Sequence, residues 1–260
     1  MEYGICGEPK IAGILAGTGY DFIELHVQRD LKTMEEEDAF LPRLKEITAA
    51  PVPAVVANCF VPGSLKITGP DVDMDLLRKY VRTAFSRAEQ AGIDTIVFGS
   101  GGARRIPEGY ERDAAWQQLL EFGRMIALIA QHHSVTVVVE PLNRRECNVF
   151  NAVGECAEYV RQIDHPNLRL LVDAYHWALE KDSYADLVDA LPLICHAHIA
   201  TYKSRMAPGL EPCDFTEFFK ALQEGGYDGR LSIEGKWTDL PGHAAKALAE
   251  LKRSARAAGL

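Results

Sequence analysis

Residues 135–141 read Val-Thr-Val-Val-Val-Glu-Pro, and residues 168–173 read Leu-Arg-Leu-Leu-Val-Asp. Both are short, mostly apolar runs that end in a carboxylate. Such runs are typical of strands that are buried on both faces, as in a parallel sheet. Similar runs recur along the whole chain. The eight strands predicted in this way are residues 3–6, 22–25, 54–58, 95–98, 136–139, 169–172, 193–199 and 230–233.

Helical patterns separate these strands. The predicted helices are residues 71–90, 114–131, 152–163, 215–224 and 242–258. This alternation, over 260 residues, predicts an α/β protein with a single (β/α)8 TIM barrel, and we expect residues 1–260 to form one domain. A doubly wound sheet is the alternative. It would normally carry a glycine-rich phosphate turn after its first strand, where this chain has Cys6-Gly7-Glu8-Pro9.

Composition excludes several classes of protein. The chain has 28 Lys and Arg against 37 Asp and Glu, a net charge of −9, so we expect no binding to nucleic acid. It has no apolar stretch long enough to span a membrane and no secretory signal at its start, so we expect no membrane partner. Its six cysteines are scattered and form no C-x-x-C pair. Reduced thiols in a cytoplasmic enzyme are the expectation.

Four consecutive predicted strands carry a polar residue at or near their carboxyl end, which is where this fold places its chemistry. These residues are Glu140, Asp173, His198 and Glu234. Because each interval between them holds one strand-helix unit, the four side chains should converge. Three carboxylates at one apolar barrel mouth would repel one another without a cation. Three oxygen ligands and one nitrogen suit Mn²⁺, Mg²⁺ or Co²⁺, with Zn²⁺ also possible.

Other polar residues lie near the same rim. Glu146 follows Glu140 by six positions, His176 follows Asp173 by three, and Arg205 follows His198 by seven. By strand alternation His196 points to the same side as His198. It is either a packed core histidine or a functional one.

The segment Gly99-Ser100-Gly101-Gly102-Ala103-Arg104-Arg105 lacks the pattern of a dinucleotide fingerprint or a P-loop. We interpret it as a flexible barrel loop with surface arginines. A phosphorylated substrate held by Arg104 or Arg105 is the alternative.

Several motifs together resemble the xylose-isomerase-like family of sugar-phosphate isomerases and epimerases. The likeness is strongest to its ketose 3-epimerase branch, the D-tagatose and D-psicose 3-epimerases. The matching segments are Asn58-Cys59-Phe60-Val61-Pro62-Gly63, Glu140-Pro141-Leu142-Asn143-Arg144 with Glu146, Asp173-Ala174-Tyr175-His176, His196-Ala197-His198 with Arg205 and Pro208-Gly209, and Ser232-Ile233-Glu234. The resemblance covers essentially the whole chain.

The resemblance implies that Glu140, Asp173, His198 and Glu234 bind one divalent metal ion, with Mn²⁺ the first choice. It also implies that Glu140 and Glu234 form the acid/base pair. Glu146, His176 and Arg205 would contact substrate hydroxyls. This chain departs from the family around the substrate pocket. It has Thr201 where many members carry an acid, and Gly235-Lys236-Trp237 where proline commonly follows the glutamate.

We therefore expect a metal-dependent sugar isomerase or epimerase that inverts C3 of a ketose through a cis-enediolate. Removing a proton from one face and returning it to the other needs two acid/base groups, which Glu140 and Glu234 supply. Hydroxypyruvate isomerase, inosose-type dehydratase and 3-keto-glycoside eliminase activities are alternatives on the same site. A sugar-binding protein without turnover is the alternative from another class. We expect a homo-oligomer, a dimer or a tetramer.

The barrel-fold apurinic endonucleases share some of these motifs but need more metal ligands. Histidines would be expected near the ends of the third and fourth strands, where this chain has Asn58 and Gly99-Ser100. DNA repair is therefore disfavoured, in agreement with the negative charge.

Overall fold

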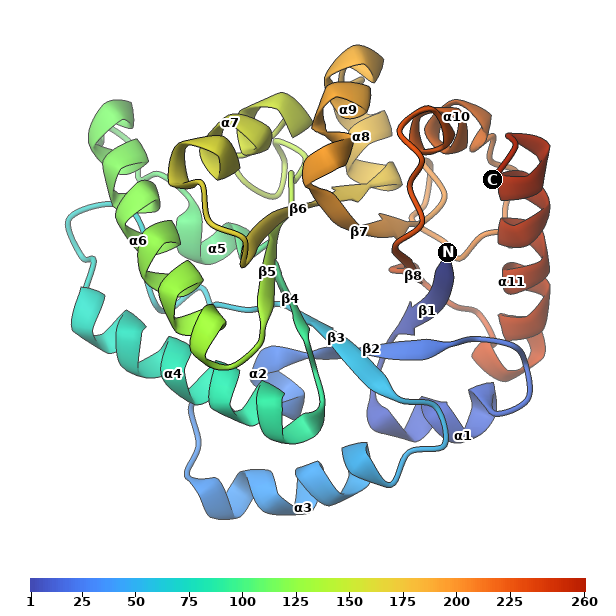
Figure 1. The fold of residues 1–260 in the computed structure, drawn as a ribbon, viewed down its shortest axis with the longest axis horizontal. Coiled ribbons are helices and arrows are strands. Elements are labelled where there is room, and N and C mark those ends of the chain that lie inside the picture. The colour runs from blue at the N-terminus through green and yellow to red at the C-terminus, as the bar shows by residue number, and fades with distance from the viewer.

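The computed structural model describes residues 1–260, in which eight strands alternate with helices (Figure 1). The strands are β1 (Glu2–Cys6), β2 (Phe22–His26), β3 (Ala54–Asn58), β4 (Thr95–Phe98), β5 (Thr136–Val139), β6 (Leu168–Asp173), β7 (Ile194–Ile199) and β8 (Arg230–Ile233). Each strand pairs in parallel with the next, and β1 pairs with β8, which closes the barrel. The predicted (β/α)8 TIM barrel is confirmed.

Helices surround the barrel, and both ends of the chain lie on the side of α11 (Figure 1). The helices are α1 (Ala12–Leu15), α2 (Val27–Asp30), α3 (Glu37–Thr48), α4 (Met74–Ala91), α5 (Gly101–Arg104), α6 (Arg112–His132), α7 (Val153–Ile163), α8 (Ala174–Glu180), α9 (Tyr184–Ala190), α10 (Thr216–Glu224) and α11 (Leu240–Ala257), with short 3₁₀ turns at Pro9–Ile11 and Leu191–Leu193. The five predicted helices correspond to α4, α6, α7, α10 and α11 within three residues at each end. None of these helices has the length and apolar character needed to cross a membrane.

Local chemistry explains where the helices begin and end. The carboxylate of Asp73 accepts hydrogen bonds from the backbone N–H groups of Asp75 and Leu76 and so caps the start of α4. At the other end Gly92 adopts a left-handed conformation with φ of 76°, which glycine allows at little cost. The helix predicted over residues 71–90 thus ends one residue later than expected, at Ala91.

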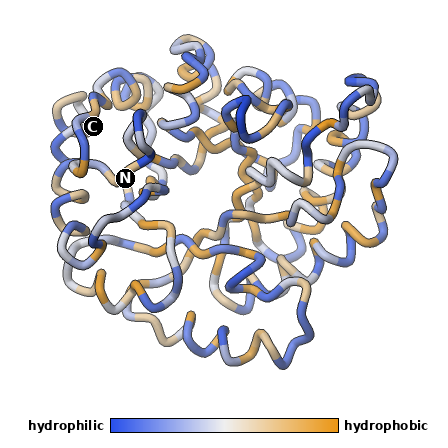
Figure 2. Tube along the Cα trace, turned by 180° about the vertical axis from the view of Figure 1, so that it is seen from behind, coloured by the Kyte–Doolittle hydropathy of each residue, from blue (hydrophilic) through white to orange (hydrophobic).

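The main apolar core lies between the barrel and its helices. It contains 77 buried residues that form one contiguous cluster. Figure 2 shows the same distribution, with the inner strands coloured mostly hydrophobic and the outer helices alternating between hydrophobic and hydrophilic. The strands are therefore buried on their outer face by the helices, as their continuous apolar sequences indicate.

A second, smaller cluster fills the inside of the barrel. Its members come from five neighbouring strands and are Phe22, Val56, Val97, Val138 and Leu171. Residues two positions apart on a strand point to the same face, so the next inward position carries Glu24, Asn58, Glu140 or Asp173 on four of these strands. The barrel interior thus has an apolar plug below and a polar layer above it, toward the carboxyl ends of the strands.

Arg104 is part of the fold, and the prediction that it is a surface arginine is wrong. Its side chain is fully buried, and its guanidinium donates to the carbonyls of Phe98 and Glu140 at 2.8 and 2.7 Å. The same guanidinium lies 5.0 Å from the centre of the Phe150 ring. Arg104 therefore ties the end of β4 to the end of β5. Arg105 is exposed and donates to the backbone carbonyl of Glu146 at 2.8 Å.

The packing of α6 on α7 gives a first prediction. A Cβ added to Gly123 would lie 2.1 Å from Tyr159 Oη and 2.3 Å from Ile163 Cδ1. Tyr159 is fully buried and donates to the Leu119 carbonyl at 2.8 Å, so it cannot move without losing that bond. We expect Gly123→Ala to lower the free energy of unfolding by about 1–3 kcal/mol, measured by urea denaturation.

Gly13 in α1 is the matched control, because a Cβ there would have no neighbour within 4 Å. We expect Gly13→Ala to leave the free energy of unfolding unchanged or to raise it by up to about 1 kcal/mol. Equal effects of the two substitutions would contradict the packing argument.

Candidate active site and metal centre

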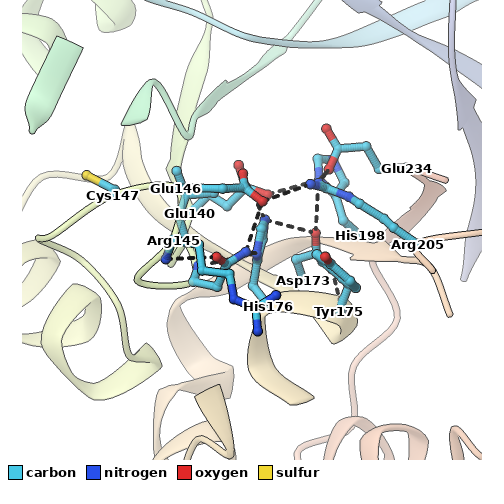
Figure 3. A network of polar contacts seen from close by, with 12 residues as sticks. Glu140, Arg145, Glu146, Cys147, Asp173, Tyr175, His176, His198, Arg205 and Glu234 are labelled. Atoms are coloured by element: carbon cyan, nitrogen blue, oxygen red, sulfur yellow. Dashed lines mark hydrogen bonds and ion pairs between the residues drawn. The ribbon is translucent and has the colours of Figure 1, made fainter. Parts of the chain in front are cut away.

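Four side chains meet at the carboxyl end of the barrel. Glu140 directly follows β5, Asp173 ends β6, His198 lies in β7, and Glu234 directly follows β8. One potential ligand atom from each lies within 4.8 Å of the others. Glu140, Asp173 and His198 are buried, whereas the side chain of Glu234 is 24% exposed. The structure thus brings together the four residues that the sequence selects (Figure 3).

His198 lies between the carboxylates. Its Nδ1 is 3.2 Å from Glu140 Oε1 and 3.6 Å from Glu234 Oε2, and its Nε2 is 2.8 Å from Glu24 Oε1. Burial alone would lower the pKa of His198, but the charges of Glu24 and Glu234 and the hydrogen bonds to Glu140 and Glu234 raise it well above its ordinary value. The carboxylates around His198 therefore favour the charged form of its imidazole.

Arg205 brings a second positive charge to the cluster. Its guanidinium forms an ion pair with Glu234, contacts Glu146 Oε1 at 3.2 Å and lies 3.7 Å from Asp173 Oδ2. It also lies over the ring of Tyr175, 4.8 Å from its centre. One arginine therefore links three carboxylates at the mouth of the barrel, and Figure 3 shows it extending across them.

His176 and Glu146 are joined through Asn143. The backbone N–H of Asn143 donates to His176 Nδ1 at 3.3 Å, and its side-chain amide nitrogen lies 2.8 Å from the same atom. That amide also donates to Glu146 Oε1 at 2.9 Å. This network assigns the ring proton of His176 to Nε2, which lies 3.6 Å from Asp173 Oδ2. Both His176 Nε2 and Asp173 Oδ2 are buried without a hydrogen-bond partner.

The environments of the two glutamates push their pKa values apart. Burial raises the pKa of Glu140; the hydrogen bond from His198 opposes this, and the charge of Glu234 adds to it. Burial would also raise the pKa of Glu234, but the positive charges of His198 and Arg205 outweigh it and lower that pKa to about 2. Two carboxyl groups with separated pKa values are the arrangement that lets one act as an acid and the other as a base.

A cavity of about 520 Å³ opens above this cluster. Only 4 of its 18 lining residues are hydrophobic, so it suits a ligand rich in hydroxyl groups more than an apolar one. Glu140, Glu146, Arg205 and Glu234 reach its wall, whereas Asp173, His176 and His198 lie outside its lining. Gly99 is also on the wall, and a Cβ there would lie 2.3 Å from Glu140 Oε2. This position therefore needs glycine to leave room for the carboxylate.

Two polar contacts of this site escape the sequence analysis. Glu24 is fully buried in β2 and lies 2.8 Å from a ring nitrogen of both His196 and His198. The only sign of this contact in the sequence is that an acidic residue, Glu24, interrupts an otherwise apolar predicted strand. Asn58 is the second case, with its amide nitrogen 3.5 Å from Glu234 Oε1. The structure also shows where His196 lies: it is fully buried, and its ring contacts Glu24.

Comparison with known proteins gives relatives among sugar epimerases and isomerases. The chain is 29% identical to a D-psicose 3-epimerase of Ruminiclostridium cellulolyticum over 125 residues, which is 48% of this chain and 42% of that protein. It is 28% identical to a putative hydroxypyruvate isomerase of Xenopus laevis over 183 residues, 67% of this chain and 66% of that protein. The chain thus spans less than two thirds of the length of these relatives.

Among solved structures, a D-allulose 3-epimerase from Methylomonas sp. superposes with a TM-score of 0.84 at 20% identity, covering 98% of both chains. At this identity the superposition shows the fold alone. The xylose isomerase-like TIM barrel family matches residues 13–257, which is nearly the whole chain. Since that match includes every strand from β2 to β8 and all four residues at the barrel mouth, the chain belongs to the xylose isomerase-like TIM barrel family.

Proposed function

We propose that this protein is a divalent-metal-dependent sugar epimerase that inverts C3 of a ketose through a cis-enediolate. The observation that carries the proposal is the pair Glu140 and Glu234, which follow β5 and β8 and meet around His198 with separated pKa values. The polar cavity above them and the epimerase relatives support it. Glu146, His176 and Arg205 are the proposed substrate-binding residues.

The donor set fits a divalent cation. Glu140, Asp173, His198 and Glu234 would hold it, with three carboxylates and one imidazole. Asp173 Oδ2 is buried without a hydrogen-bond partner, because Arg205 at 3.7 Å and His176 Nε2 at 3.6 Å are both too distant, so a cation in closer contact would lower the cost of burying it. Mn²⁺ is our first choice, with Mg²⁺, Co²⁺ and Zn²⁺ as alternatives. When bound, the metal would supply the positive charge that stabilises the negative oxygens of an enediolate.

The protein's own groups then move the proton. Glu234, held ionised by Arg205, removes the proton from C3 on one face of the ketose. Glu140, whose pKa is raised by burial, returns a proton to the other face. In the reverse reaction the two residues exchange roles. Arg205 keeps Glu234 oriented while it is charged, since its guanidinium contacts that carboxylate directly.

Hydroxypyruvate isomerisation is the second candidate. It needs the same enolisation but returns the proton to the neighbouring carbon. This candidate is supported by the similarity of 67% of the chain to a putative hydroxypyruvate isomerase. Lys236, an exposed cation on the cavity wall, would suit the carboxylate of such a substrate.

Deuterium exchange separates these functions. Mn²⁺-loaded protein is incubated in D₂O with a panel of ketoses and with hydroxypyruvate, and the products are followed by proton NMR. We expect deuterium to enter C3 of one ketose together with its C3 epimer. Exchange in hydroxypyruvate alone would favour the isomerase. Binding of a sugar without any exchange of carbon-bound hydrogen would contradict both and favour a binding protein.

Substitution of the two glutamates tests their roles. We expect Glu140→Gln and Glu234→Gln each to lower the rate of C3 exchange by about 10²–10⁴-fold, because an amide cannot transfer the proton. Equilibrium dialysis should still detect bound sugar. Glu250→Gln, which alters an exposed ion pair with Arg253, is the control and should exchange at the wild-type rate. Wild-type exchange in either site variant would rule out that residue as an acid or base.

Removal of the metal tests the donor set. We expect protein dialysed against a chelator to lose C3 exchange and to regain it with Mn²⁺. In differential scanning calorimetry Mn²⁺ at about 100 times its Kd should raise the free energy of unfolding by about 2.7 kcal/mol. Full activity of the chelated protein, with no change in its melting temperature on adding Mn²⁺, would mean that the site works without a cation.

A further inference from the structure

The carboxylate of Glu24 hydrogen-bonds only with two histidines. It lies in β2 on the polar layer inside the barrel and is fully buried. Its Oε1 is 2.8 Å from His198 Nε2 and its Oε2 is 2.8 Å from His196 Nε2. A buried carboxylate usually meets an arginine, a lysine or backbone N–H groups. Here the only hydrogen bonds that it forms come from imidazole rings.

This geometry fixes which nitrogen of His198 carries a proton. A carboxylate has only acceptor atoms, so a ring nitrogen at 2.8 Å must present an N–H to it. Nε2 of His198 therefore carries a proton, whereas Nδ1 faces the carboxylates of Glu140 and Glu234, the proposed metal ligands. A histidine binds a metal ion only through a nitrogen that has lost its proton. Because Glu24 holds the Nε2 proton, Nδ1 is the atom that would bind a cation, in place of any proton shared with Glu140.

We infer that Glu24 is a positioning residue for the metal site. By accepting from His198 Nε2 it keeps the imidazole in the tautomer and orientation that direct the Nδ1 lone pair at a divalent cation. A carboxylate behind a metal-binding histidine is a general way to set both features. This inference rests on the proposed function, because it assigns Glu24 a role at the metal site proposed above.

His196 holds the other end of the carboxylate. Its ring lies edge-on to that of His198, with centres 5.0 Å apart and planes at 85°. The Ser232 hydroxyl lies 3.4 Å from the same Nε2 that contacts Glu24. His196 Nδ1 has no partner, so Glu24 and the Ser232 hydroxyl are the only hydrogen-bonding contacts of this ring. His196 therefore fixes Oε2 of Glu24, which leaves Oε1 aimed at His198.

Two substitutions at Glu24 distinguish positioning from packing. Methionine matches glutamate in length but accepts no strong hydrogen bond, whereas glutamine keeps one oxygen that can accept from His198 Nε2. Mn²⁺ affinity, measured from the EPR signal of the free ion, should fall about 10–100-fold in Glu24→Met. It should fall less in Glu24→Gln, because the remaining acceptor partly restores the tautomer. A packing role predicts the opposite order, with the apolar methionine tolerated at least as well.

The control removes a different buried charge. Asp30 is fully buried in α2, where it contacts Arg29 at 2.6 Å and accepts from the backbone N–H of His26. We expect Asp30→Asn to destabilise the fold while leaving Mn²⁺ affinity within about two-fold of the wild type, since it touches none of the proposed ligands. Folded Glu24→Met with wild-type Mn²⁺ affinity would overturn the inference.

A measurement on the wild-type protein covers the case in which the variants fail to fold. Correlation of ring ¹⁵N and ¹H signals, in the metal-free protein and with diamagnetic Zn²⁺, reports the proton on each nitrogen of His198. We expect the Nε2 proton in both states and no proton on Nδ1 when Zn²⁺ is bound. A proton retained on Nδ1 with Nε2 deprotonated would overturn the inference. If the protein takes up neither Mn²⁺ nor Zn²⁺, the proposed function fails, and loss of the Nε2 proton in the metal-free spectrum would by itself overturn the role of Glu24.

Discussion

Repulsion among buried carboxylates is the constraint on which the rest of this structure depends. Glu140, Asp173 and Glu234 offer oxygen atoms within 4.8 Å of one another at the mouth of an apolar barrel. In such surroundings like charges destabilise each other, and each loses its hydration. His198 and Arg205 supply positive charge from inside and outside the cluster. The proposed divalent cation would meet the same need for positive charge.

The pairing register of the barrel strands brings these residues together. Asp173 is the direct neighbour of His198 on the adjacent strand, and His198 is the direct neighbour of Ser232. Since side chains alternate along a strand, the residues two positions earlier form the layer beneath, with Leu171 and His196 among them. That lower layer is apolar at Phe22, Val97 and Val138. The closed β-sheet therefore sets the level at which the acidic groups meet.

Much of this could be predicted from the sequence, because it depends on local patterns. Apolar runs located all eight strands, and the polar residues at or near the carboxyl ends of four of them located the four central side chains. The rest depends on contacts between distant segments. The sequence of residues 99–105 does not reveal that the rings of Phe98 and Phe150 enclose Arg104. Nor does it reveal that Glu24 meets two histidines more than 170 positions away.

Three residues of the cavity wall have an unusual backbone conformation. Cys59, Ser100 and Arg205 all line it, and each has a positive φ, between 41° and 55°, which costs non-glycine residues about 1–2 kcal/mol. Hydrogen bonds hold each in place. Gln28 donates to the Cys59 carbonyl at 2.7 Å, Ser100 Oγ accepts from the Val61 N–H at 2.9 Å, and the Lys236 N–H donates to the Arg205 carbonyl at 2.7 Å. These bonds offset part of the backbone strain at three positions of the wall that faces the two glutamates.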